Sequence, residues 1–173
     1  MLTHLTRSLG SRALLAGALL SLAACGSKSE PTPDTPTLYN RVGQTNGVAT
    51  LVDNLIANVA AETAVNNSVM LRTHQPLLDA INGVNGAPPT DPTRLQRLRN
   101  NFINQLGEAA GGPLKYTGKS MLAAHTGMNI TTTEYNVWFA QWEKAMTASK
   151  VTGQERTELN AILNKMQGDV VGH

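Results

Sequence analysis

GGPLKYTGKSMLAAHTGMNI, residues Gly111 to Ile130, is the stretch of sequence that decides the fold. It places His125 between a turn broken by glycine and proline and a run of apolar residues. Neutral imidazole is the commonest metal ligand in proteins, and this imidazole has apolar neighbours and few polar alternatives. Gly111, Gly112 and Gly118 disfavour a regular helix before it, so a short loose segment leads into the candidate ligand.

The same stretch resembles the haem-side signature of the truncated haemoglobins, those of group 1 in particular. The residues that carry the resemblance are Gly111-Gly112-Pro113, Tyr116-Thr117-Gly118, Met121, Ala124-His125-x-Gly127 and Ile130. Two further segments resemble the opening and the ending of these proteins, namely Leu38 to Gly43 (LYNRVG), with Val52-Asp53-Asn54 after it, and Met166 to Val171. The likeness covers roughly residues 38–171 and is interrupted between about 69 and 94.

This resemblance implies that His125 is the proximal ligand of a haem b iron, a standard form of haem attachment. His4 lies in the N-terminal segment and His173 is the last residue, so His74 is the one other histidine of the globular part. The resemblance also implies an all-α fold, a two-over-two helical sandwich around the haem.

On the distal side, an alignment without gaps departs from the family pattern. Leu55 and Ile56 fall where the family often has an aromatic pair, and Leu98 and Phe102 fall at two positions that face the iron. None of these four side chains can donate a hydrogen bond to bound dioxygen. Gln105 lies one turn further on, where we expect a solvated polar face; its entry into the distal site is the alternative. His74 is an alternative sixth ligand.

The remaining haem contacts follow from the same resemblance. We expect an apolar wall around the porphyrin from Met121, Ala124, Ile130 and Trp138. The candidates for the propionates are Arg99, Lys115, Tyr116 and Lys119.

The apolar pattern of the chain is helical, without sustained strand alternation. Apolar residues recur every three or four positions in four stretches, at about 46–62, at about 92–109, from Tyr135 to Met146 and from Leu159 to Val170. Thr131-x-x-Glu134 and Thr152-x-x-Glu155 have the pattern of capping boxes that begin the last two helices. Residues 70–93 read as an insertion, with a short helix at 70–81 broken near Pro76 and a loop from Asn82 to Pro92.

The N-terminus has the pattern of a bacterial lipoprotein signal. Arg7 and Arg12 precede an apolar run at 13–23, about half the length of a membrane-spanning helix. Leu22-Ala23-Ala24-Cys25 resembles the lipoprotein box, whose cysteine is lipidated after cleavage; an ordinary signal peptide with an incidental Cys25 is the alternative. We therefore expect a signal peptide at 1–24, a lipidated Cys25 with a flexible tether at 25–37, and a globin domain at 38–173. The expected location is the bacterial cell envelope, at the outer membrane if the cell is Gram-negative.

Charge excludes one class of partner. Without Arg7 and Arg12 the chain has 12 of its 14 basic side chains against 12 acidic ones, and no basic patch indicates a nucleic-acid partner. We expect a membrane-tethered haem protein that binds dioxygen, nitric oxide or carbon monoxide. Nitric-oxide dioxygenation, with an electron donor, is a candidate reaction. The alternatives are a haem-based redox or sensing module and a structural helical lipoprotein without haem.

Overall fold

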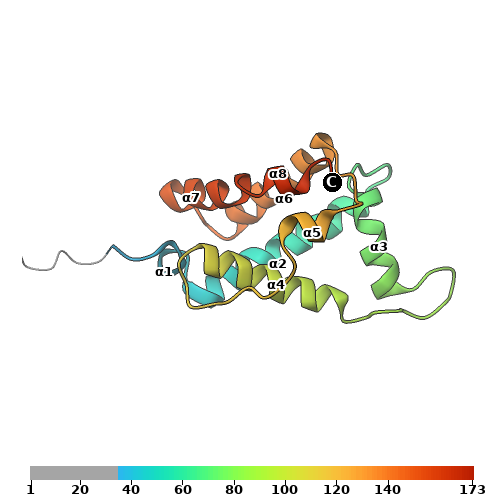
Figure 1. Ribbon diagram of the computed structural model, residues 1–173, viewed down its shortest axis with the longest axis horizontal. Coiled ribbons are helices and arrows are strands. Elements are labelled where there is room, and N and C mark those ends of the chain that lie inside the picture. The colour runs from blue at the N-terminus through green and yellow to red at the C-terminus, as the bar shows by residue number, and fades with distance from the viewer. Residues whose placement is uncertain (1–34) are drawn as a thin grey trace, which may run out of the picture. The chain divides into compact units, whose positions relative to one another are not determined.

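The computed structural model describes residues 35–173, which form eight helices (Figure 1). The expected signal peptide, Cys25 and residues 26–34 of the tether lie outside this range. The helices are α1 (Leu38–Arg41), α2 (Gln44–Thr63), α3 (Leu71–Asn82), α4 (Arg94–Ala109), α5 (Met121–His125), α6 (Thr132–Ala148), α7 (Gly153–Asn164) and α8 (Gln167–Val170). Among residues 35–173 the sole β-type pairing is an isolated bridge between Ile130 and Val171, which confirms the all-α prediction.

Two layers of helices enclose the core. Helix α2 packs against both α4 and α6, and α6 and α7 lie over α2 and α4 (Figure 1). The largest fully buried side chains are Leu51 of α2, Leu106 of α4, Trp142 and Met146 of α6, and Leu159 of α7, together with Met70, Val48 and Val52. The predicted apolar stripes therefore supply the core, and the two-over-two sandwich is confirmed.

Two parts of the family signature, the opening LYNRVG and the turn at Gly111-Gly112-Pro113, pack against each other. The Tyr39 N–H donates to the Ala110 carbonyl at 2.9 Å, and the Tyr39 ring covers Gly112 so closely that a Cβ there would lie 2.5 Å from Tyr39 Cδ2. Arg41 donates from Nε to Glu155 at 3.0 Å and from Nη2 to Glu158 at 2.5 Å. The LYNRVG opening thus joins the end of α4 to α7, and Gly43 makes the sharp start of α2 with a φ of +93°.

Three local predictions are wrong. Helix α3 continues through Pro76, although an interior proline removes one helix hydrogen bond and clashes with the preceding turn; the packing of α3 on α4 supports it. The stretch from Leu159 to Val170 is two helices, α7 and α8, rather than one. Thr152 begins α7 without a side-chain bond, and the Glu155 carboxylate, the other half of the expected box, accepts from Arg41.

The other capping box and the loop are confirmed. Thr131 Oγ1 accepts from the Glu134 N–H, and Glu134 Oε2 accepts from the Thr131 N–H at 2.8 Å. Residues 83–93 contain no helix or strand, as the glycine, asparagine and proline content predicts. Within residues 35–173, every helix is too short or too polar to cross a bilayer.

Candidate functional site

The imidazole of His125 is oriented by its own helix. Helix α5 begins at Ser120, whose hydroxyl accepts from the Ala123 N–H at 3.2 Å. Four residues after Met121, His125 Nδ1 lies 2.7 Å from the Met121 carbonyl oxygen. A carbonyl can only accept, so Nδ1 carries the proton and the neutral ring keeps its free lone pair on Nε2. This is the arrangement in which a histidine acts as a metal ligand through Nε2.

A single imidazole suits a cofactor that brings its own equatorial ligands. Among residues 35–173, no group of three or more His, Cys, Asp or Glu side chains lies close enough to hold a bare metal ion. A porphyrin supplies four nitrogen ligands, so the iron needs only one further ligand from the protein. The donor set around His125 therefore fits haem.

Large apolar side chains of α4 and α5 remain exposed. Leu98 of α4 is 49% exposed and Leu122 of α5 is 44% exposed, although large apolar side chains are normally buried. Phe102 of α4 is half-buried, with its ring centre 6.4 Å from that of Trp138 and 6.3 Å from that of Trp142. Such surfaces suit a flat apolar ligand.

The predicted distal residues come from two adjacent helices. Leu55 of α2 is buried in the core, and Ile56 is half-buried against it. Helix α4, which carries Leu98 and Phe102, packs on α2. The roles of these four residues toward the haem stay predictions.

Gln105 differs from expectation. It is half-buried rather than solvated, and its Nε2 lies 3.6 Å from Met166 Sδ, between α7 and α8. The amide thus reaches the thioether of Met166, which is a weak acceptor. Gln105 is thus a donor that the α4 pattern alone assigned to the surface.

His74 lies on α3 and is mostly buried. Its Nδ1 lies 2.9 Å from the Met70 carbonyl and 3.1 Å from Thr73 Oγ1. Burial lowers its pKa, opposed by the bond to Met70 and by the charge of Glu134, so the neutral ring is favoured. The Nδ1–H form again leaves a lone pair on Nε2, and the role of His74 as a sixth ligand stays a prediction.

The expected porphyrin-wall residues differ in burial. Ile130 is buried, Met121 and Trp138 are half-buried and Ala124 is exposed. Ile130 is also fixed by its backbone, because its carbonyl accepts from the Gly172 N–H at 2.9 Å.

The propionate candidates already have protein partners. Arg99 donates to both Asp53 oxygens, at 2.5 and 2.7 Å, and these bonds lower the pKa of Asp53. Lys115 Nζ lies 3.1 Å from Glu108 Oε1, and the Tyr116 hydroxyl donates to the Lys119 carbonyl at 2.6 Å. Their assignment to propionates stays a prediction, and Asp53 of the Val52-Asp53-Asn54 motif has a structural partner.

Two surface hollows lie away from His125. One, of about 250 Å³, lies at the surface between α2 and α6 and is lined by Asn58, Glu62, Gln141 and Lys144, among others. The other, of about 460 Å³, is lined by Leu38, Ala110 and Ile162, among others. Neither lining includes Leu98, Phe102 or His125, so both are separate from the candidate haem site.

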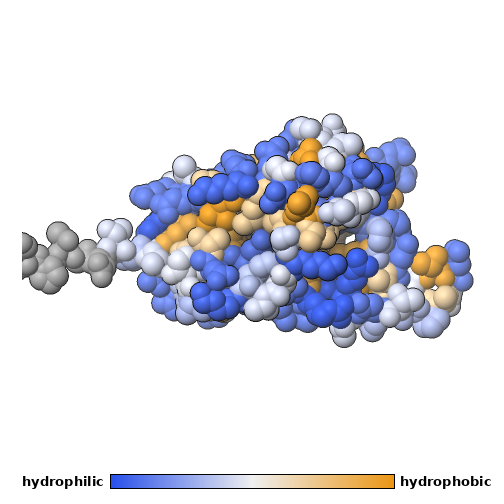
Figure 2. Space-filling model, in the orientation of Figure 1, coloured by the Kyte–Doolittle hydropathy of each residue, from blue (hydrophilic) through white to orange (hydrophobic). Residues whose placement is uncertain are grey.

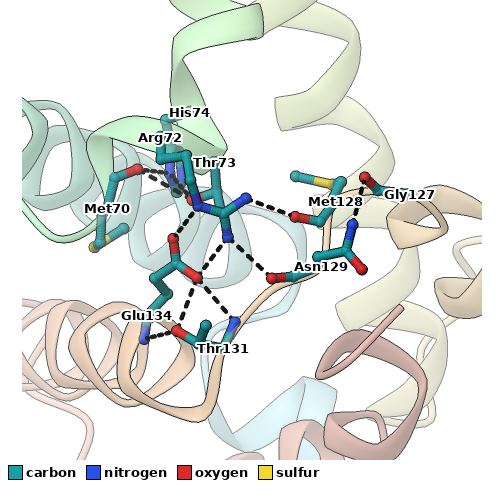
Figure 3. A network of polar contacts seen from close by, with 9 residues as sticks. All are labelled: Met70, Arg72, Thr73, His74, Gly127, Met128, Asn129, Thr131 and Glu134. Carbon is teal, nitrogen blue, oxygen red and sulfur yellow. Dashed lines mark hydrogen bonds and ion pairs between the residues drawn. The ribbon is translucent and has the colours of Figure 1, made fainter.

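The sequence patterns do not indicate one residue that bonds the segment after His125, Arg72. It bonds Glu134 and the backbone of the α5–α6 connection (Figure 3). Glu134 was expected only as a helix cap, and Arg72 has no local motif. The partners are 62 residues apart, so no short-range pattern indicates the pair.

Comparison with known proteins identifies a family for this chain. The profile of the family described as bacterial-like globin matches residues 85–171, half of the chain and all of α4 to α8. The chain therefore belongs to the bacterial-like globin family. Globin membership implies a haem iron as the cofactor.

Solved structures with the same fold are truncated haemoglobins. The chain resembles the Fe(III) form of the truncated haemoglobin from Tetrahymena pyriformis with a TM-score of 0.61 and 20% identity, over 80% of this chain and 100% of that one. It resembles a Tyr26Ala mutant of the group II truncated haemoglobin from Bacillus anthracis with a TM-score of 0.54 and 19% identity, over 79% of this chain and 92% of that one. These likenesses confirm a truncated globin fold.

Proposed function

We propose that this globin binds diatomic gases at a haem b iron ligated by His125, and that it is a group 1 truncated haemoglobin. The observation that carries the proposal is the 2.7 Å contact between His125 Nδ1 and the Met121 carbonyl, which leaves Nε2 available to iron. The residues from Gly111 to Ile130, which resemble the group 1 signature, support the group assignment. When bound, the haem iron supplies a reversible coordination site for dioxygen, nitric oxide or carbon monoxide.

The distal side chains favour gases that need no hydrogen bond. Leu55, Ile56, Leu98 and Phe102 present only carbon atoms, whereas bound dioxygen is stabilised by a donor. A hydrogen bond to a charged acceptor contributes about 1.5–3 kcal/mol, so its absence corresponds to roughly tenfold or more in dioxygen retention. We therefore propose that carbon monoxide and nitric oxide are held better, relative to dioxygen, than in globins with a distal tyrosine.

Optical and resonance Raman spectra of the purified, haem-loaded protein test this proposal. We expect a ferrous form with a histidine–iron stretching band and an open sixth position that carbon monoxide fills. The redox or sensing alternative predicts a six-coordinate ferrous spectrum without added ligand, which becomes five-coordinate in His74→Ala. Failure to bind haem stoichiometrically would favour the structural lipoprotein.

Nitric-oxide dioxygenation is the enzymatic reaction that this site allows. It consumes nitric oxide and dioxygen, yields nitrate, and needs an electron donor to return the iron to the ferrous state. Mixing nitric oxide with the oxygenated protein and measuring nitrate tests it. Nitrate in amounts no greater than in a protein-free control would contradict it.

We also propose that the globin is lipid-anchored in the bacterial cell envelope, at the outer membrane if the cell is Gram-negative. The support is sequence alone, Leu22-Ala23-Ala24-Cys25 and the proline-rich residues after it. A tether of this composition has too few apolar residues to form a core. Gas binding and anchoring are therefore expected to be separable.

A further inference from the structure

Arg72 of α3 holds four oxygen atoms that belong to α6 and to the connection between α5 and α6 (Figure 3). Its Nε and Nη2 donate to Glu134 Oε1 and Oε2 at 2.9 and 2.7 Å. Its Nη1 donates to the Met128 carbonyl at 2.9 Å, and Nη2 also donates to the Asn129 carbonyl at 3.0 Å. One guanidinium thus fixes a helix start and two consecutive peptide groups, a geometry that lysine cannot reproduce.

The carboxylate at the centre of this network is buried and ionised. The Glu134 side chain is only 7% exposed, and its Oε2 accepts from the Thr131 N–H and hydroxyl, both at 2.8 Å. The hydrogen bonds from Arg72, foremost, hold the pKa of Glu134 at about 2. The network is therefore charge-assisted at neutral pH, with stronger bonds than neutral partners would make.

Helix α5 depends on such contacts at its ends. Helix α5 packs on α8, but none of residues 121–125, all of them described, is buried, so burial fixes this five-residue helix less than it fixes the core helices. Its N-terminal side is held by Ser120 and by the bond from Tyr116 to the Lys119 carbonyl. A helix of this length is not stable by itself, so the anchor at its C-terminal end contributes to the position of His125.

The path from Arg72 to His125 runs through one residue. The Met128 N–H donates to the His125 carbonyl at 3.0 Å, and the Met128 carbonyl accepts from Arg72. On the other side of the connection, the backbone of Gly172 and His173 bonds Ile130 and Asn129. Residues 128–130 are thus held from both sides, directly after the iron ligand.

We propose that Arg72 is a positioning residue for the proximal histidine, acting through Met128 and Glu134. The proposal rests on the proposed role of His125 as iron ligand. It gives a function to α3, which lies in the segment expected as an insertion. Loss of the guanidinium removes one of the two anchors of residues 128–130 and lets the imidazole tilt relative to the haem.

The test compares Arg72→Gln with Arg97→Gln in the haem-loaded protein. Arg97 is the matched control, because its side chain is 57% exposed against 55% for Arg72 and it pairs with Asp91 rather than with residues 126–130. We expect a shifted or broadened histidine–iron stretching band in Arg72→Gln and roughly tenfold faster haem loss, the size of one charge-assisted bond. Arg97→Gln should behave like wild type.

A result in which both variants match wild type in the stretching band and in haem loss would overturn the proposal. Arg72→Lys keeps the charge without the planar fork, so it should restore haem retention only in part. If Arg72→Gln does not fold, the stretching band and the rate of haem loss are measured in Arg72→Lys instead.

Amide hydrogen exchange separates this proposal from the proposed function. In the protein as purified, Arg72→Gln should speed exchange at residues 126–130 and leave α4 unchanged. If wild type binds no haem, the proposed function fails. If exchange at residues 126–130 is unchanged in Arg72→Gln, the role of Arg72 fails, whether or not wild type binds haem.

Discussion

At the scale of the residue, the chemistry of the site depends on which ring nitrogen of His125 is free. The Met121 carbonyl, 2.7 Å from Nδ1, selects the tautomer that offers Nε2 to a metal. His74 has the same kind of bond to Met70, at 2.9 Å. The chain thus contains two histidines of like tautomer, and substitution distinguishes their roles.

His125→Ala should abolish proximal ligation. We expect little or no stoichiometric haem binding, or binding with altered coordination, because the chain then lacks the imidazole of α5. The measurement is the haem-to-protein ratio after reconstitution together with the ferrous spectrum. His74→Ala is the matched control and should keep the proximal signature; a normal histidine–iron band in His125→Ala would refute the assignment.

A donor introduced at the distal side should slow dioxygen release. Ile56→Tyr adds a hydroxyl at one of the two positions where the resemblance implies an aromatic pair, so we expect roughly tenfold slower release by stopped-flow, the effect of one hydrogen bond to a charged acceptor. Carbon monoxide release should change less, because it depends less on a donor.

Gln105 tests the same prediction from the opposite direction. If wild-type release is already slow and Gln105→Leu speeds it, Gln105 is the native donor. The variant is informative because the Gln105 amide is a hydrogen-bond donor in a half-buried position beside Met166. Equal release in wild type and Gln105→Leu would agree with an apolar distal side.

Acid should weaken the protein through Glu134. Its pKa is about 2 in the folded state against an ordinary value of 4.5, so its stabilising contribution is present above pH 4.5 and is lost as the pH falls toward 2. Denaturant unfolding between pH 7 and pH 2.5 should show a steeper loss in wild type than in Glu134→Gln. At pH 7 the variant should be less stable by about 1–2 kcal/mol, since Arg72 is half-exposed and partly screened.

His74 acts in a different pH window. Burial lowers its pKa in the folded protein, so the unfolded chain takes up the proton first. Stability is then lost as the pH falls below about 6.5, the ordinary histidine value. A loss confined to that window, and absent below pH 4.5, would contradict the prediction for Glu134.

At the scale of the element, the glycine-rich turn after α4 serves packing. Tyr39 of α1 lies against Gly112, and Ala110 accepts from the Tyr39 backbone. Arg41 extends the same opening segment to Glu155 and Glu158 of α7. Two segments of the family signature, about 70 residues apart in the chain, therefore form one contact, and its role is structural.

Gly112→Ala should destabilise the fold. The added Cβ would lie 2.5 Å from Tyr39 Cδ2 and 2.8 Å from the Gly107 carbonyl, and overpacking of this kind costs about 1–3 kcal/mol. Thermal or denaturant unfolding measures the loss. Gly168→Ala is the control, because nothing lies within 4 Å of a Cβ there; equal stability of the two variants would contradict the packing role.

At the scale of the whole molecule, the helical layers enclose a continuous core while α5 lies outside it. The space-filling view shows hydrophobic residues among hydrophilic ones on the face drawn (Figure 2). Leu98 and Leu122 are among the exposed large apolar residues of the described chain. Helix α5 thus depends on its packing on α8 and on the bonds at its ends, whereas the two layers depend on burial.

Anchoring should be independent of gas binding. Cys25→Ser should abolish lipid labelling and membrane retention during detergent-free fractionation, because the acyl chains supply the membrane affinity. The haem spectrum of the variant should equal that of wild type. Unchanged membrane retention would contradict lipidation, and an altered haem spectrum would contradict the separation of the two functions.

Local patterns determined the helical class, the positions of α2, α4 and α6, the Thr131 cap and the candidate ligand His125, because periodicity, capping and motif act over a few residues. Tertiary structure alone decided which partners the polar side chains have. Arg72 meets Glu134 across 62 residues and Arg41 meets Glu155 across 114. Such pairs follow from how the helices pack. Local patterns therefore do not indicate the network of Arg72, the bond from Arg41 to Glu155 or the half-buried position of Gln105.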